Sequence, residues 1–245
     1  MNNNKRIAHT PTSVEVFKKC PREYKAKYIN KDLPYFQSPE AARGDKIHKA
    51  LEDYLVRRGE YELPEYARGA KGTLDYLLSN YEVSTEAKFR VNEQLDPCEW
   101  ADKGAWFGGI ADVVLHRKDN PDHIIVLDWK TGKPQTDADE RKYGNKHEVQ
   151  SEILAIAAGK KYNATTVTTL FIFLDHAVAK KYTYTFKDNQ TTLMAHAPLF
   201  NTIRRMEKAV LDNKFPPTKN GLCEKYCGLT KCQYNGRFEG GDDYE

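Results

Sequence analysis

Two aspartates and a lysine have the types and the spacing that hydrolysis at a metal ion requires. Asp112 ends the segment 109–112, and Asp128 and Lys130 lie two residues apart in the segment 127–132. The turn signal at 120–122 separates them, which predicts an antiparallel hairpin. Paired residues in such a hairpin have a constant number sum. A turn centred on Asn120 makes this sum 240, so Asp112 and Asp128 would face each other with Cβ atoms ~5 Å apart.

Two carboxylates in that arrangement repel each other within strands that are otherwise apolar on both faces. A divalent cation offsets the repulsion, and two carboxylates with waters suit Mg²⁺ or Mn²⁺. Lys130 shares a strand face with Asp128, whereas Trp129 points into the core. A lysine there can orient an attacking water and stabilise developing charge. The plainer alternative is an ion pair between Asp128 and Lys130 beside a solvated Asp112.

The elements that must position these residues alternate between helical and strand patterns. Apolar spacing predicts helices at 13–29, 40–57, 65–80, 147–162 and 190–213. Strand patterns occupy a stretch from residue 83 and then 106–117, 123–130, 166–174 and 181–186, the last as an edge strand. Strands 106–117 and 123–130 are apolar on both faces and are therefore expected at the centre of the sheet. The order predicts an α/β domain with helical additions, spanning 1–236 and followed by an acidic, flexible tail at 237–245.

The composition excludes several classes of protein. The 245 residues are 40% hydrophobic and 30% charged, which is ordinary for a globular domain. No apolar run approaches the ~20 residues that cross a bilayer, and we see no secretory signal, so we expect a cytoplasmic protein without a membrane partner. The net charge of +3 neither requires nor opposes nucleic acid.

Three of the five cysteines crowd together near the C-terminus. Cys223, Cys227 and Cys232 form this group, with Cys20 near the other end of the chain and Cys98 a lone thiol. In a reducing compartment crowded cysteines are more often metal ligands than disulfides. Four thiolates could hold Zn²⁺.

The hairpin with its flanking residues resembles the catalytic core of the PD-(D/E)xK nuclease superfamily, in its RecB and AddB branch. The segment 44–48, which ends at His48, resembles the GxxxH helix motif of that branch. Glu86 lies where the branch often has a glutamate, and Gln150 matches its QxxxY motif in part, with Leu154 in place of tyrosine. The resemblance covers about residues 13–232 and implies a restriction-endonuclease-like central mixed sheet flanked by helices.

The resemblance also implies roles for these positions. Asp112 and Asp128 would bind the metal with the Trp129 carbonyl, and His48 would be a ligand or its neighbour. Lys130 would position the water, Glu86 would join the catalytic group, and Gln150 would hold the lysine or a nucleotide. A purely structural role is the alternative for His48, Glu86 and Gln150. His48 could end an apolar helix stripe, Glu86 could be solvated, and Gln150 could be an ordinary helix residue.

The cysteine arrangement resembles the iron–sulfur nucleases of the AddB type and of CRISPR adaptation. This likeness implies a [4Fe–4S] cluster held by Cys20, Cys223, Cys227 and Cys232 that clamps the N- and C-terminal helical segments, with zinc or free thiols as alternatives. Basic residues beside Cys20 and after the catalytic strand could bind phosphates, with Arg141, Lys142, Tyr143 and Lys146 as the best placed.

The sequence therefore predicts a metal-dependent deoxyribonuclease, as an exonuclease acting on single strands or ends. A structure-specific endonuclease on the same core and a non-catalytic iron–sulfur DNA-binding module are the alternatives. Because the chain has no helicase P-loop, unwinding would come from a helicase, a recombination protein or a CRISPR partner.

Overall fold

The computed structural model describes residues 7–33 and 37–237, except for the side chains of residues 142 and 143. The chain forms two compact units, each built from two separate segments. The first unit contains residues 1–10 and 37–196, and the second contains residues 11–36 and 197–245.

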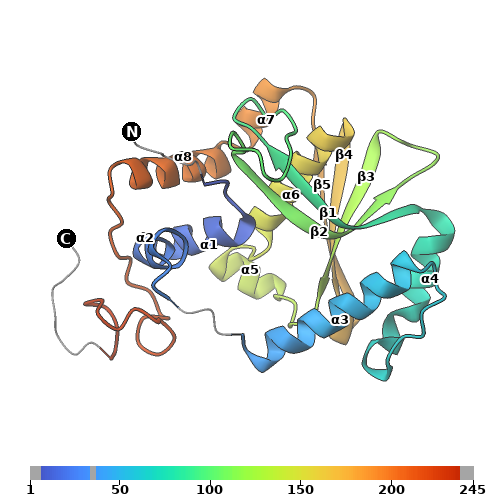
Figure 1. Ribbon diagram of the computed structural model, residues 1–245, viewed down its shortest axis with the longest axis horizontal. Coiled ribbons are helices and arrows are strands. Elements are labelled where there is room, and N and C mark those ends of the chain that lie inside the picture. Colours follow the sequence, from blue (N-terminus) through green and yellow to red (C-terminus); the bar gives the residue numbers. More distant parts are fainter. Residues whose placement is uncertain (1–6, 34–36, 238–245) are drawn as a thin grey trace. The chain divides into compact units, whose positions relative to one another are not determined.

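A five-stranded mixed sheet forms the centre of the first unit (Figure 1). The strands lie in the order of the chain: β1 (Glu82–Val91), β2 (Phe107–His116), β3 (His123–Lys130), β4 (Thr166–Phe173) and β5 (Val178–Thr185). All neighbours are antiparallel except β3 and β4, which are parallel. This arrangement confirms the predicted mixed sheet flanked by helices and the predicted edge position of the last strand.

Helix α6 (Glu148–Tyr162) connects the two parallel strands and packs on one face of the sheet. Its residues from Ile153 to Gly159 are all buried, which a helix rich in alanine permits. A Cβ at Gly159 would lie 3.1 Å from the ring of Phe186, so this small residue lets the helix approach closely. The last turn of α6 thereby lies close to Val167 of β4 and to Phe186, which follows β5.

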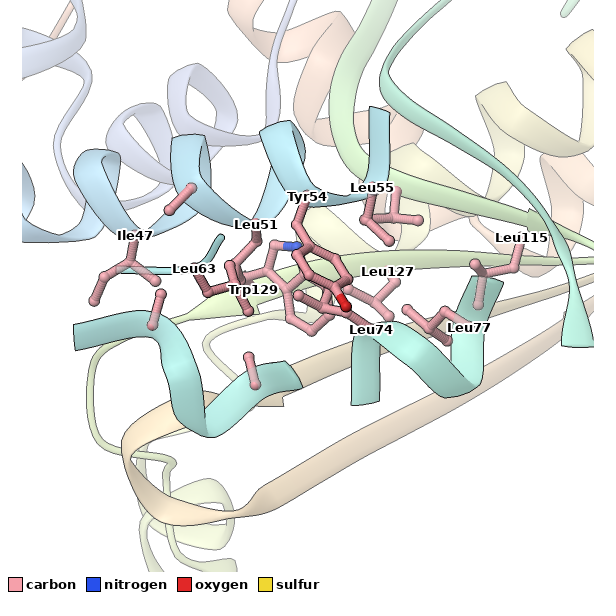
Figure 2. Packing of buried hydrophobic residues seen from close by; sticks show 14 residues of the cluster. Ile47, Leu51, Tyr54, Leu55, Leu63, Leu74, Leu77, Leu115, Leu127 and Trp129 are labelled. Atoms are coloured by element: carbon pink, nitrogen blue, oxygen red, sulfur yellow. The ribbon is translucent and has the colours of Figure 1, made fainter. Parts of the chain in front are cut away.

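The opposite face of the sheet is covered by α3 (Pro39–Val56), the 3₁₀ helix η2 (Glu65–Ala70) and α4 (Lys71–Asn80). Figure 2 shows the buried cluster that joins these helices to the strands, with Leu51 and Tyr54 of α3 beside Leu127 and Trp129 of β3. Because side chains alternate along a strand, Asp128 points to the other face, toward α6. The predicted inward orientation of Trp129 is confirmed.

The predicted helix at 13–29 is wrong as a single element. The segment forms α1 (Pro11–Lys19), α2 (Pro21–Tyr24) and a π-helix, η1 (Lys25–Asn30). The break falls at Cys20, whose backbone is extended. A residue before proline is disfavoured in the helical region, and Pro21 cannot donate a backbone hydrogen bond.

The predicted helix at 190–213 is also divided, into α7 (Asn189–Ala195) and α8 (Ala197–Leu211). Pro198 in the first turn of α8 has no N–H to continue the earlier helix. The sequence reading missed α5 (Asp137–Tyr143), which Thr136 and Asp139 begin with a reciprocal capping box.

Of the predicted acidic tail, residues 238–245 lie outside the described part of the chain. Arg237 lies inside it, and its side chain donates to the Cys227 carbonyl. In the ranges 7–33 and 37–237, every helix is too short or too polar to pass through a bilayer.

Candidate active site

The hairpin of β2 and β3 has the predicted register. The paired residues run from His116 with Ile124 to Val113 with Leu127, and each pair sums to 240. The next pair in this register would be Asp112 and Asp128, but the ladder stops one pair before them. The two aspartates therefore lie at the end of the hairpin where the strands separate.

The Asp112 carboxylate forms a hydrogen bond at the point where the strands separate. Its Oδ2 accepts a hydrogen bond from the Trp129 backbone N–H at 2.7 Å. A side chain of β2 thus replaces the main-chain bond that a continued ladder would make. The bond fixes the Asp112 carboxylate next to the segment that carries Asp128 and Lys130.

Asp128 is the most buried acid of the site, with 7% of its surface exposed. Gln150 Nε2 donates to its Oδ1 at 2.6 Å, and Lys130 Nζ lies 2.6 Å from its Oδ2. Lys130 also donates to Gln150 Oε1 at 3.0 Å, which closes a ring of three side chains. Burial raises the pKa of Asp128, the charge of Lys130 opposes the rise, and the charge of Asp112 adds to it.

His48 reaches the site from α3. Its Nδ1 lies 3.3 Å from Asp112 Oδ1. Burial disfavours the charged imidazole, but the hydrogen bond and the charge of Asp112 outweigh it, so the pKa of His48 lies above its ordinary value. One helical turn earlier, a Cβ at Gly44 would lie 3.2 Å from Thr131 Oγ1. The glycine lets α3 lie close to the residues that follow β3.

Glu86 lies opposite Asp112 in the register of β1 and β2, where the pairing is interrupted. Its φ of 49° is in the left-handed region, which non-glycine residues rarely adopt. Burial raises the pKa of the Glu86 carboxyl, and the charges of Asp112 and Glu52 add to the rise. Glu86 thus lies within electrostatic range of Asp112, although its side chain is exposed.

The structure adds two residues that the sequence reading missed. The Phe171 ring on β4 lies 5.4 Å from Lys130 Nζ, and the His147 ring stacks on the same phenylalanine with centroids 4.8 Å apart. Burial and the charge of Lys130 lower the pKa of His147 to about 4. The sequence does contain a signal for His147. It lies three positions before Gln150 at the start of α6, and this spacing puts both residues on one helix face.

The donor set fits a divalent cation. Asp128 is buried with its Oδ2 against Lys130 Nζ at 2.6 Å, and the neighbouring Asp112 adds a second negative charge that one ammonium does not balance. Two neighbouring carboxylates, one of them buried, repel each other and therefore favour a bound cation. No group of three or more His, Cys, Asp or Glu side chains in the described ranges has the arrangement of a formed metal site. The ligand set of His48, Asp112, Asp128 and the Trp129 carbonyl therefore stays a prediction.

The predicted phosphate-binding residues lie on α5 and in the turn before α6. Arg141 and Lys146 are exposed, and the Lys146 backbone N–H donates to Gln135 Oε1 at 2.8 Å. The side chains of Lys142 and Tyr143 lie outside the described part of the chain.

The second unit brings the four predicted cysteine ligands to one cavity of about 200 Å³. They are Cys20, Cys223, Cys227 and Cys232, and all are free thiols. The Thr218 N–H donates to Cys20 Sγ at 3.5 Å, and the Asn220 N–H donates to Cys223 Sγ at 3.3 Å. Cys98 belongs to the first unit and does not line this cavity.

Comparison with known proteins finds one family. The sequence pattern of the PD-(D/E)XK nuclease superfamily matches residues 8–235. No curated protein matches the chain. A solved structure described as the crystal structure of SSO0001 is similar, with 17% sequence identity and a TM-score of 0.44, over 89% of this chain and 80% of that one.

Proposed function

The chain belongs to the PD-(D/E)XK nuclease superfamily, and from this membership and the site we propose a metal-dependent deoxyribonuclease that degrades single-stranded DNA from an end. Members of the superfamily are nucleases, which are hydrolases, and they typically use divalent metals such as Mg²⁺. The observation that carries the proposal is the ring of Asp128, Lys130 and Gln150 beside Asp112. A structural ion pair would need neither the second acid nor the amide that joins lysine to aspartate.

Each residue of the site has a defined task in phosphodiester hydrolysis. A Mg²⁺ or Mn²⁺ ion held by Asp112 and Asp128, with the Trp129 carbonyl and His48, would supply Lewis-acid stabilisation of the negative charge on the phosphoryl oxygens. Lys130 orients the attacking water and stabilises the negative charge that develops during attack. Gln150 holds the Lys130 ammonium at its position.

The remaining site residues act on these groups. His48 fixes the Asp112 carboxylate through the contact between Nδ1 and Oδ1. Glu86 adds negative charge beside Asp112 and supports cation binding. Arg141 and Lys146, with Lys142 and Tyr143, bind the phosphate backbone and unpaired bases of the strand.

The cysteine cavity supports a [4Fe–4S] cluster as the second cofactor. Four cysteines line one space, and backbone N–H groups point at two of their sulfurs, as negatively charged thiolates favour. We propose on this basis, and on the motif resemblance, that the chain belongs to the RecB and AddB branch. Unwinding of duplex DNA would come from a helicase or from a recombination or CRISPR partner.

A cleavage assay on linear and circular single-stranded DNA tests the proposed activity. In Mg²⁺ or Mn²⁺ we expect the wild-type protein to shorten end-labelled linear DNA and to leave the circle intact. Asp128→Asn and Asp112→Asn should abolish cleavage, whereas Asp119→Asn, at an exposed turn position, should not. Cleavage of the circle indicates the endonuclease instead. Absence of cleavage by the wild-type protein in both metals indicates a non-catalytic DNA-binding module.

Purification without oxygen tests the cluster. Brown protein with a broad visible absorption band is expected, and Cys232→Ser should lose the colour while Cys98→Ser keeps it. Colourless wild-type protein that contains zinc would reject the cluster.

A further inference from the structure

The second unit contains a larger cavity beside the cysteine cavity, with which it shares Leu229 and Cys232 as lining residues. Its volume is about 540 Å³, within the range of small-molecule sites. It is formed by residues of α2, η1 and the segment that follows η1, by the segment after α8, and by residues 228–232. These segments all belong to the second unit, whereas Asp112, Asp128 and Lys130 belong to the first.

The lining of this cavity is strongly basic. Arg22, Lys25, Lys214 and Lys231 contribute four positive side chains, against the single carboxylate of Asp32. Lys214 and Lys231 are exposed, and within the described chain no ion pair of Lys25, Lys214 or Lys231 is found. By contrast, Lys19 and Lys27 on the same segment as Lys25 pair with Glu23. Lys25, Lys214 and Lys231 thus face the cavity without a carboxylate partner in the described part of the chain.

The cavity also has a flat apolar wall. Phe215 lies in it, backed by Tyr24 with ring centroids 6.3 Å apart, and Leu33 and Leu229 extend the apolar surface. Lys25 Nζ lies 5.5 Å from the centre of the Phe215 ring. A positive charge thus lies directly beside a ring surface, so a ligand with both a phosphate and a planar ring would contact both.

Two amide side chains complete the lining. Asn30 and Asn213 line the cavity, with Asn30 Nδ2 donating to Asp32 Oδ2 at 2.8 Å, and side-chain amides can recognise the polar edge of a base. A phosphate alone would have no use for the ring or the amides, and an apolar molecule would not require four cations.

We propose that this cavity binds one nucleoside monophosphate unit, with the phosphate among Lys25, Lys231 and their basic neighbours and the base along Phe215. The unit could be a free mononucleotide or the phosphorylated end of a single strand. Both share the same recognition chemistry. The proposal does not require that the chain be a nuclease.

Calorimetric titration with mononucleotides tests the proposal independently of cleavage, because dTMP contains no phosphodiester bond. We expect the wild-type protein to bind dTMP at least ten times more tightly than thymidine. Lys25→Gln and Lys231→Gln should each weaken dTMP binding about 10–100-fold, as loss of a charged hydrogen bond to phosphate does. Lys225→Gln, an exposed lysine of the same unit outside the cavity, should leave it unchanged.

A second variant separates the base from the phosphate. Phe215→Leu should weaken dTMP binding several-fold and leave the binding of inorganic phosphate unchanged. Since Phe215 is buried and this variant could fail to fold, the variants of the half-buried Lys25 and the exposed Lys231 test the proposal by themselves.

Short oligonucleotides distinguish the two sources of the ligand. If 5′- or 3′-phosphorylated hexathymidylate binds more tightly than dTMP, the cavity holds a strand end; if dTMP binds more tightly, it holds a free nucleotide. Equal binding of dTMP and thymidine, or lysine variants that behave as Lys225→Gln, would overturn the proposal. Because these measurements involve no cleavage, a failed nuclease assay would not affect them.

Discussion

Replacing Lys130 with methionine separates its structural from its catalytic contribution. Methionine keeps the apolar stem of the lysine and removes its ammonium group, which is the charged partner of Asp128. The Lys130 side chain is 24% exposed and the Asp128 side chain is 10% exposed, so the ion pair is largely buried. Removing one partner of a buried ion pair costs ~3–5 kcal/mol. Asp128 keeps its bond from Gln150 Nε2, so we expect the lower end, about 3 kcal/mol. At ~2–4 °C per kcal/mol, the melting temperature should fall by roughly 6–12 °C.

The same substitution should lower the cleavage rate by about 10²–10³-fold, the loss that accompanies removal of one stabilising group for developing negative charge. Thermal denaturation followed by circular dichroism gives the first quantity, and single-turnover cleavage well below the melting temperature gives the second. Added Mg²⁺ should recover part of the stability, because the cation compensates Asp112 and Asp128, but none of the rate. Lys118→Met, at an exposed position in the turn between β2 and β3, is the matched control.

Two results would refute this reasoning. A Lys130→Met protein that cleaves DNA at the wild-type rate would show that the lysine does not act on the water or on the developing charge. An unchanged melting temperature without metal would show that Asp128 does not depend on its ammonium partner.

Three further substitutions test neighbouring parts of the first unit. Gln150→Leu should lower kcat about tenfold with little change in KM, as measured by steady-state cleavage, because the Lys130 ammonium loses the amide and keeps only its ion pair with Asp128. His147 has a pKa of about 4 in the folded protein against an ordinary 6.5. The unfolded chain therefore takes up the proton first as the pH falls below 6.5, and the wild-type protein loses up to about 3 kcal/mol of stability between pH 6.5 and 4. His147→Phe should lack this loss in denaturant titrations at the two pH values. Gly108→Ala should destabilise the protein by about 1–3 kcal/mol in the same titration, since the new Cβ would lie 2.0 Å from the Phe89 carbonyl oxygen.

The hairpin could be predicted because its information is local. The turn at 120–122 lies between two short strands, and its centre alone sets the sum of 240 that every pair obeys. Helix α6 was equally accessible, since it follows the hairpin and its apolar residues are continuous. Asp128, Lys130 and Gln150 all lie on these two elements, so the sequence could bring them together.

The helix break at Cys20 could have been predicted but was not. Pro21 signals it, but the apolar spacing continues across the break and favours one longer helix. The contact between His48 and Asp112 is different, because it joins a helix and a strand 64 positions apart in the chain. No local pattern specifies that distance; it follows from how α3 packs over Trp129 and Leu127.

The regular strand pattern around Asp112 gives no sign that the backbone pairing of this residue is interrupted on both sides. On one side the pairing with β3 ends at Val113, and on the other the pairing with β1 skips Glu86, whose φ is 49°. A left-handed non-glycine residue costs ~1–2 kcal/mol. In return, Asp112 is released from both ladders, and its carboxylate can accept from the Trp129 N–H and meet His48. Uninterrupted ladders would be less strained, but they would keep the two strands together at the position where a cation must enter between their carboxylates.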